Sequence, residues 1–224
     1  MKRLLLTVAS LLVLAVGASA ATLCDDVVIP LYDPGAIGQG VDCETGQLIL
    51  HNIFGILNEG DPSDDMTVSF AGVVETEAGP GGKQFLFLPP FLSGETGDIF
   101  LTFSVMTRDG GAWISGVGLD TQGTTENNWS IAENVCASPI TNVLTGNCDD
   151  LLVVLNVQAD GPTSAFAVLD QGYSMLWIWK DLRKSGEGEW SSFTQTYNVP
   201  EPVSFVLMGS GLLALGLLRR RAKK

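Results

Sequence analysis

The side chains best suited to catalysis are two glutamates and the only histidine of the chain. Glu75 and Glu77 lie two residues apart in a predicted strand, so their side chains share a face. Paired carboxylates hydrolyse glycosides when they lie roughly 5–9 Å apart, but a solvated strand face explains them better in a chain with 25 acidic residues. His51 would have to serve any Ser-His-Asp or Cys-His site. We therefore predict no enzyme, and a secreted hydrolase is the least favoured alternative.

Calcium is the only cofactor for which the sequence offers a candidate site. Asp61, Asp64 and Asp65 lie within the stretch Asn-Glu-Gly-Asp-Pro-Ser-Asp-Asp, residues 58–65. Calcium takes six to eight oxygen ligands, and one such loop with backbone carbonyls could supply most of them. The spacing differs from that of an EF-hand, and acidic turns often bind nothing. The prediction is therefore no firm metal site.

Two tryptophans could bind sugars. Trp177 and Trp179 alternate with Ile178, so their rings share one face of a predicted strand. Aromatic rings stack on sugar faces, but they also fill the core between two sheets. Core filling is the favoured interpretation, and a carbohydrate-binding module, with or without calcium, is the alternative. Two neighbouring rings that are both open to solvent would favour sugar binding.

The four cysteines predict disulfide bonds, because an even number is typical of exported chains. Four cysteines allow three pairings. We favour Cys24 with Cys43 and Cys136 with Cys148, because each pair closes a short loop, worth about 3 kcal/mol per bridge. A zinc site is disfavoured, since the chain has no C-x-x-C and a single histidine.

The middle of the chain consists of short apolar or alternating runs separated by turn residues. No long stretch has convincing helical periodicity, and Asp109-Gly110-Gly111 is one of several strong turn signals. We predict an all-β fold, an antiparallel, jelly-roll-like β-sandwich, with a closed barrel as the alternative. The predicted strands cover residues 47–54, 66–70, 84–88, 98–106, 112–119, 129–135, 151–157, 164–169, 174–182 and 190–197.

The charge of this middle region limits its partners. It holds 24 carboxylates against five basic side chains, a formal charge of −19, whereas the whole chain has −13. Nucleic acid is not expected to bind so acidic a surface.

The first 20 residues predict an export signal. A basic start is followed by an apolar run and then by Ala18-Ser19-Ala20, with Ala18 and Ala20 at the positions that a signal peptidase reads. We expect cleavage after Ala20, with the Sec export machinery and signal peptidase as partners.

The last 27 residues predict a membrane segment. Residues 203–218 are apolar, and as a helix they would span about 24 Å, slightly less than a hydrocarbon core of ~30 Å. Proline at 200 and 202 opposes helix before this segment. A basic cluster after it should stay cytoplasmic and stop translocation; its members are Arg219, Arg220, Arg221, Lys223 and Lys224.

These C-terminal elements, in this order, resemble the PEP-CTERM protein-sorting signal. The resemblance rests on Val199, Pro200, Glu201 and Pro202, on the apolar segment 203–218 and on the basic tail 219–224. It implies recognition by an exosortase, a membrane-embedded transpeptidase-like cysteine protease, with processing near the Pro-Glu-Pro triplet. It also implies a Gram-negative host that makes exopolysaccharide. An ordinary C-terminal anchor is the alternative.

Together these features predict three segments of the chain and a route of export and sorting. Residues 1–20 are the signal peptide, 21–197 an extracytoplasmic domain, and 198–224 the sorting signal. We expect an inner-membrane-anchored precursor that is processed and delivered to the cell envelope, the outer surface or the extracellular matrix. The expected role there is structural or interactive, linked to exopolysaccharide and biofilm.

Overall fold

The computed structural model describes residues 22–62, 64–91, 95–108, 112–123, 128–185 and 190–200, without side-chain detail for six of them. The predicted signal peptide with Ala18 and Ala20, and the C-terminal residues from Glu201 to Lys224, lie outside the described residues. Among the residues that are described, no helix has the length and apolar character needed to cross a membrane.

The described chain folds into two large β-sheets and one small hairpin. The first, here called the β15 sheet, has the order β1 (Val27–Val28), β5 (Thr67–Thr76), β6 (Gly79–Leu88), β15 (Trp190–Asn198), β8 (Ile114–Gly123), β13 (Ser164–Tyr173). The second, the β14 sheet, has the order β12 (Leu151–Gln158), β9 (Asn128–Cys136), β14 (Met175–Ser185), β7 (Gly97–Thr107), β4 (Leu48–Glu59), β2 (Leu31–Tyr32), with β3 (Val41–Glu44) also on β4. The hairpin consists of β10 (Ile140–Asn142) and β11 (Asn147–Cys148).

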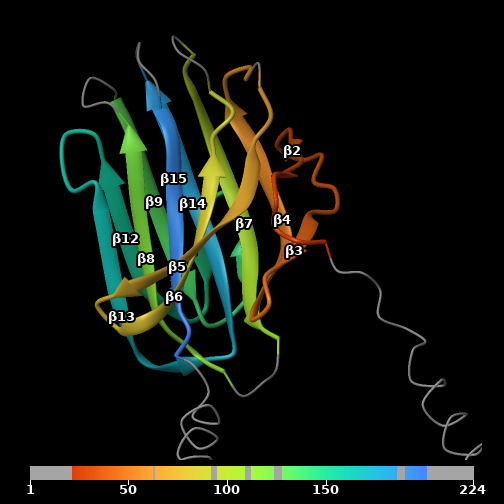
Figure 1. Ribbon diagram of the computed structural model, residues 1–224. Helices are drawn as coiled ribbons and strands as arrows, with labels where there is room; N and C mark the ends of the chain where they lie inside the picture. Colours follow the sequence, from red (N-terminus) through yellow and green to blue (C-terminus); the bar gives the residue numbers. More distant parts are fainter. Residues whose placement is uncertain are drawn as a thin grey trace, which may run out of the picture.

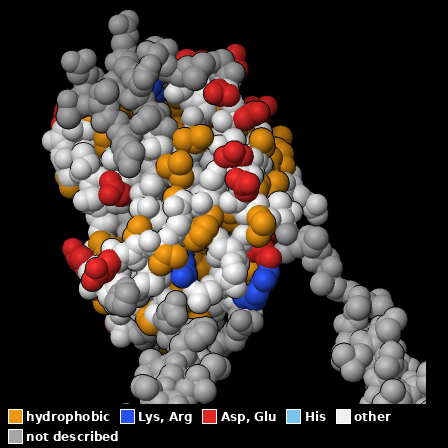
Figure 2. All heavy atoms as spheres, in the orientation of Figure 1, with side chains coloured by type: hydrophobic (Ala, Val, Ile, Leu, Met, Phe, Trp, Pro, Cys, Tyr) orange, Lys and Arg blue, Asp and Glu red, His pale blue; other side chains and the backbone are white. Residues whose placement is uncertain are grey.

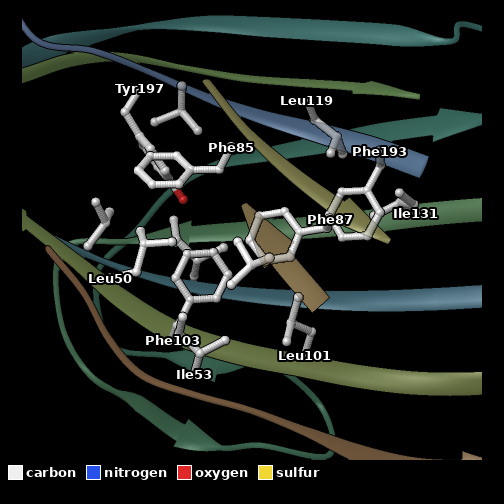
Figure 3. Close-up of a cluster of buried hydrophobic side chains, with 14 of the residues drawn as sticks. Leu50, Ile53, Phe85, Phe87, Leu101, Phe103, Leu119, Ile131, Phe193 and Tyr197 are labelled. Carbon is white, nitrogen blue, oxygen red and sulfur yellow. The ribbon is translucent and has the colours of Figure 1, made fainter. Parts of the chain in front are cut away.

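The two sheets stack face to face and enclose the core (Figure 1). On β7, the alternating residues Ile99, Leu101, Phe103 and Val105 point into it. Figure 3 shows the centre of this core, where the Phe87 and Phe193 rings stack with centroids 4.9 Å apart. The all-β prediction is confirmed, with two open sheets in place of a closed barrel. Strand pairing is antiparallel apart from β2 with β4.

The connectivity places the last two long strands in the middle of the sheets, β14 in one and β15 in the other. Strand β4 pairs with β7 in the β14 sheet, and the two strands between them in sequence, β5 and β6, pair with each other in the β15 sheet. Strands β8, β9, β12 and β13 repeat this nested pattern. β14 then inserts between β9 and β7, and β15 between β6 and β8 (Figure 1). As a result, the residues from Ser192 to Val199 are all buried.

The structure contains both disulfides in the local pairing that the sequence favours. Cys24 is joined to Cys43 across 4.8 Å between Cα atoms, and Cys136 to Cys148 across 6.4 Å. The first bridge holds the segment before β1 against β3. The second closes the chain around the β10–β11 hairpin.

The five basic residues of the body do not all lie on its surface. Lys83, Lys180 and Lys184 are buried, at 7%, 0% and 2% exposure. Arg108 and Arg183 remain exposed and form ion pairs with carboxylates. The surface is therefore more acidic than composition alone implies, and carboxylates are spread over the face shown in Figure 2.

Candidate functional site

The tryptophans of β14 lie on the outer face of the β14 sheet, not in the core between the sheets. Leu176 and Ile178 point inward, so Trp177 and Trp179 point away from the core. The β10–β11 hairpin covers Trp179, whose Nε1 donates a 2.7 Å hydrogen bond to the carbonyl of Val143. The interpretation that these rings fill the inter-sheet core is wrong, because the alternating residues Leu176 and Ile178 fill it.

Burial of Trp179 also limits the sugar-binding alternative. Trp179 is only 6% exposed and stacks on Phe100 with centroids 5.6 Å apart. Trp177 is partly exposed and lines a depression of about 400 Å³ beside the hairpin. The two rings are therefore not both open to solvent, and only Trp177 can present a face to a ligand.

The rim of this depression is polar and includes the single histidine. His51 Nδ1 lies 2.8 Å from Asp42 Oδ1, with both side chains about half exposed, at 50% and 57%. Ser104 is the cross-strand partner of His51, and Asn52, with a φ of 54°, completes this side of the depression. The residue types of a Ser-His-Asp site thus lie close together, although nothing in the spacing of the sequence singles out Asp42 or Ser104.

Glu75 and Glu77 line a second depression, on the outer face of the β15 sheet. Its volume is about 380 Å³, and it crosses β5, β6, β15, β8 and β13. Asp120 of β8 contributes a third carboxylate. Burial raises the pKa of Asp120, and a hydrogen bond from the backbone at Thr121 opposes this shift. This depression is acidic and shallow, and it repels anionic ligands.

The acidic stretch proposed for calcium lies at the surface between β4 and β5. Asp61, Asp64 and Asp65 are exposed, and the backbone N–H of Asp65 donates to Asp64 Oδ1 at 2.9 Å. Within the described ranges, no three His, Cys, Asp or Glu side chains converge as metal ligands. Calcium remains a candidate at this loop only.

A closed polar triangle lies inside the core, where the sequence predicted no site. Lys180 Nζ of β14 donates hydrogen bonds to Glu133 Oε2 of β9 and to Gln195 Oε1 of β15. Gln195 Nε2 donates to Glu133 Oε1 at 3.0 Å, which completes the triangle. All three side chains are 0% exposed. Lys180 and Glu133 are cross-strand partners in one sheet, and Gln195 reaches them from the other.

The surroundings of this triangle are apolar and aromatic. The Phe193 ring centroid lies 5.5 Å from Lys180 Nζ. Burial lowers the pKa of Lys180 and raises that of Glu133, and the attraction between the two opposes both shifts. Burial, and secondarily Glu133, raise the pKa of Tyr197 well above its usual value. Burial therefore shifts both groups towards their neutral forms.

A signal for this triangle does exist in the sequence. Each of its members occupies an inward position between two apolar ones: Glu133 between Ile131 and Val135, Lys180 between Ile178 and Leu182, and Gln195 between Phe193 and Tyr197. A charged or amide residue on the apolar face of a buried strand needs a partner inside the protein. Three such interruptions indicate a shared buried site.

The first residue of the predicted sorting motif is buried in the fold. Val199 is 0% exposed and its N–H donates to the carbonyl of Gly81 at 3.3 Å, whereas Pro200 is exposed. Asn198 Nδ2 donates to the carbonyl of Ala78 in the turn between β5 and β6. Within the described residues, the buried part of the body therefore extends two residues past 197, and the first proline of the predicted motif is exposed. Glu201 and Pro202 lie outside the described residues.

The chain matches no known protein-family model and no curated protein sequence.

Proposed function

We propose that this protein is an exported PEP-CTERM surface or matrix protein, processed by an exosortase and linked to exopolysaccharide or biofilm. One observation carries the proposal: Val199, the last buried residue of the part of the chain that the structure describes, is followed directly by the exposed Pro200 of the Pro-Glu-Pro triplet. Cleavage at this triplet would therefore leave every described strand complete, since β15 ends at Asn198.

Two further features are compatible with export of the protein. Two disulfides suit an oxidising, extracytoplasmic compartment. An acidic surface favours solubility and cation association, and it disfavours binding to other acidic polymers through charge alone. The role of the body would then be structural or interactive, with no catalysis required.

Mass spectrometry of the mature protein from a host with an active exosortase tests the proposal. We expect a chain that starts at Ala21 and ends within or next to the Pro200-Glu201-Pro202 triplet. The double variant Pro200→Ala with Pro202→Ala should keep the C-terminal residues through Lys224. The control Pro162→Ala changes an exposed proline in a turn of the body and should be processed normally. A wild-type chain that still ends at Lys224 in this host would sink the proposal.

A second candidate function, carbohydrate binding, is favoured by the depression beside Trp177. An aromatic platform next to the polar side chains of His51, Asn52 and Ser104 suits a neutral sugar, which offers an apolar face and hydroxyl groups. Titration with neutral glucan oligosaccharides, with and without calcium, tests this. Trp177→Ala should weaken binding about tenfold.

Trp113 provides the matched control for that titration, because it is 56% exposed and does not line the depression. Trp113→Ala should bind as the wild type does. Equal losses in both variants, or no binding at millimolar sugar, would remove the carbohydrate function.

A further inference from the structure

We propose that Lys180 and Gln195 form an intramolecular isopeptide bond, with Glu133 as the proton-transfer group. The bond would join Lys180 Nζ to Gln195 Cδ and release one molecule of ammonia. It would covalently connect the two sheets through their central strands, β14 and β15.

The lysine amine already contacts the amide group that it would attack. Lys180 Nζ hydrogen-bonds Gln195 Oε1, which is one bond away from the carbon that it would attack. Glu133 contacts both partners, through Oε2 to the amine and through Oε1 to the amide nitrogen at 3.0 Å. This is the placement needed by a group that must take a proton from the amine and give one to the leaving nitrogen. Holding reactants in such an arrangement removes most of the entropic barrier to reaction.

The protonation states required for the reaction are those that burial favours. A lysine nucleophile must be an uncharged amine, and a general acid must carry its proton. Moving one proton from the Lys180 ammonium to the Glu133 carboxylate produces both at once and removes two buried charges. Full burial favours this transfer, because it lowers the pKa of Lys180 and raises that of Glu133.

The reaction balances without any oxidant or cofactor. The lone pair of Nζ attacks Cδ, and the carbonyl electron pair moves onto the carbonyl oxygen. Glu133 takes one proton from Nζ and gives its own proton to Nε2, the two atoms that it contacts. The Cδ–Nε2 bond then breaks, ammonia leaves with its electron pair, and the electron pair on the oxygen re-forms the carbonyl. The products are one secondary amide, one ammonia and an unchanged carboxylic acid.

The enclosure protects the site from the competing reaction, which is hydrolysis of the amide. The strand partners of the triangle are apolar and buried: Leu101 opposite Lys180, Leu155 opposite Glu133, and Phe85 and Leu119 opposite Gln195. Phe193 lies over Nζ. Bulk water is thereby kept from the electrophilic carbon, while the amine is held next to it.

The bond would change how a mechanical force is transmitted between the two sheets. Lys180 and Gln195 are 15 residues apart in sequence, and Gln195 lies four residues before the last buried residue. A pull on the C-terminal end of β15 would therefore reach β14 through a covalent link and would not rely on hydrogen bonds alone. Formation of the bond needs only the folded body, so this proposal stands or falls independently of exosortase sorting.

Mass spectrometry of the full chain, exported and folded, tests the proposal. We expect an intact mass lower than that of the two-disulfide chain by one ammonia. After reduction and trypsin digestion, we expect a branched peptide in which Lys180 is linked to Gln195 and is not cut by trypsin. Glu133→Gln should lower the linked fraction at least tenfold in freshly folded protein. Lys180→Met should abolish it. Lys184→Arg, a change on the same strand outside the triangle, should retain it.

Two results would overturn the proposal. One is a folded wild-type protein whose fragments carry a free Lys180 amine and an unmodified Gln195 amide after prolonged incubation. The other is an ammonia loss that fragmentation places at another residue. Because both readouts use the wild type, they remain decisive even if the Glu133 and Lys180 variants fail to fold.

Discussion

At the scale of single residues, the carboxylate of Asp181 on β14 interacts with that of Asp98 on the neighbouring strand β7. Asp98 of β7 accepts a 3.0 Å hydrogen bond from Asn58 Nδ2. Arg183 lies 3.0 Å from Asp181 and 3.6 Å from Asp98. Burial, and next the neighbouring Asp98, raise the pKa of Asp181 from 3.8 to about 6, although Arg183 opposes the shift. The folded protein therefore holds a proton on Asp181 at pH values where the unfolded chain has lost it.

This shift predicts a loss of stability as pH rises. Between pH 3.8 and about 6 the native state binds more protons at Asp181 than the unfolded state, so the free energy of unfolding falls with increasing pH. Asp181→Asn should remove this dependence and should be more stable than the wild type at pH 7 by about 1 kcal/mol, a value discounted for solvent screening. Urea midpoints at pH 4 and pH 7 measure the difference.

Asp160 supplies the control for the pH measurement, because it lies exposed in a turn. Asp160→Asn should follow the wild-type curve at both pH values. An Asp181→Asn protein whose urea midpoint tracks the wild type from pH 4 to pH 7 would contradict the assignment of this slope to Asp181.

At the scale of elements, the long strands could be predicted from the sequence and the short ones could not. Each of the ten long strands overlaps a predicted run, because alternation over five or more residues gives a clear period-2 pattern. β1, β2, β3, β10 and β11 contain two to four residues each, too few to show a period. They form because disulfides and neighbouring strands hold them in place.

The hairpin of β10 and β11 explains why the prediction that Trp177 and Trp179 fill the core between the sheets is wrong. Alternation predicts that Trp177 and Trp179 share a face, and they do. It cannot tell which face is the core, because Leu176 and Ile178 on the other side are apolar as well. The hairpin decides the outcome: the Cys136–Cys148 bridge holds it over Trp179, and Gly146 approaches so closely that a Cβ would lie 2.3 Å from the ring.

The buried triangle was missed for a different reason. Its contacts join residues 47 and 15 positions apart on three strands of two sheets. Spacing within one strand carries no information about which strand will lie opposite. The inward polar positions could be read from the sequence, but their convergence depends on the insertion of β14 and β15 into the middle of the sheets.

At the scale of the whole molecule, the same insertion ties the integrity of the body to its C-terminal end. β15 pairs with β6 on one side and β8 on the other, and its register with both continues to Asn198. The last strand of the described chain is thus a central strand, and residues just before Pro200 contribute to the core. Tyr197 is 0% exposed and contacts the Phe85 ring, with centroids 6.0 Å apart (Figure 3).

This arrangement predicts a sharp boundary for the stable body. A chain of residues 21–200 should unfold at the same urea concentration as one with a few more residues, because Pro200 is exposed. A chain that stops at Thr196 loses the buried side chains of Tyr197 and Val199 and the ladder bonds of Asn198. Removing one buried aromatic side chain typically costs about 3–5 kcal/mol, so this shorter chain should be largely unfolded at 37 °C. Circular dichroism and urea titration of the two chains measure the difference. Equal stability would mean that residues 197–199 contribute nothing to the sandwich.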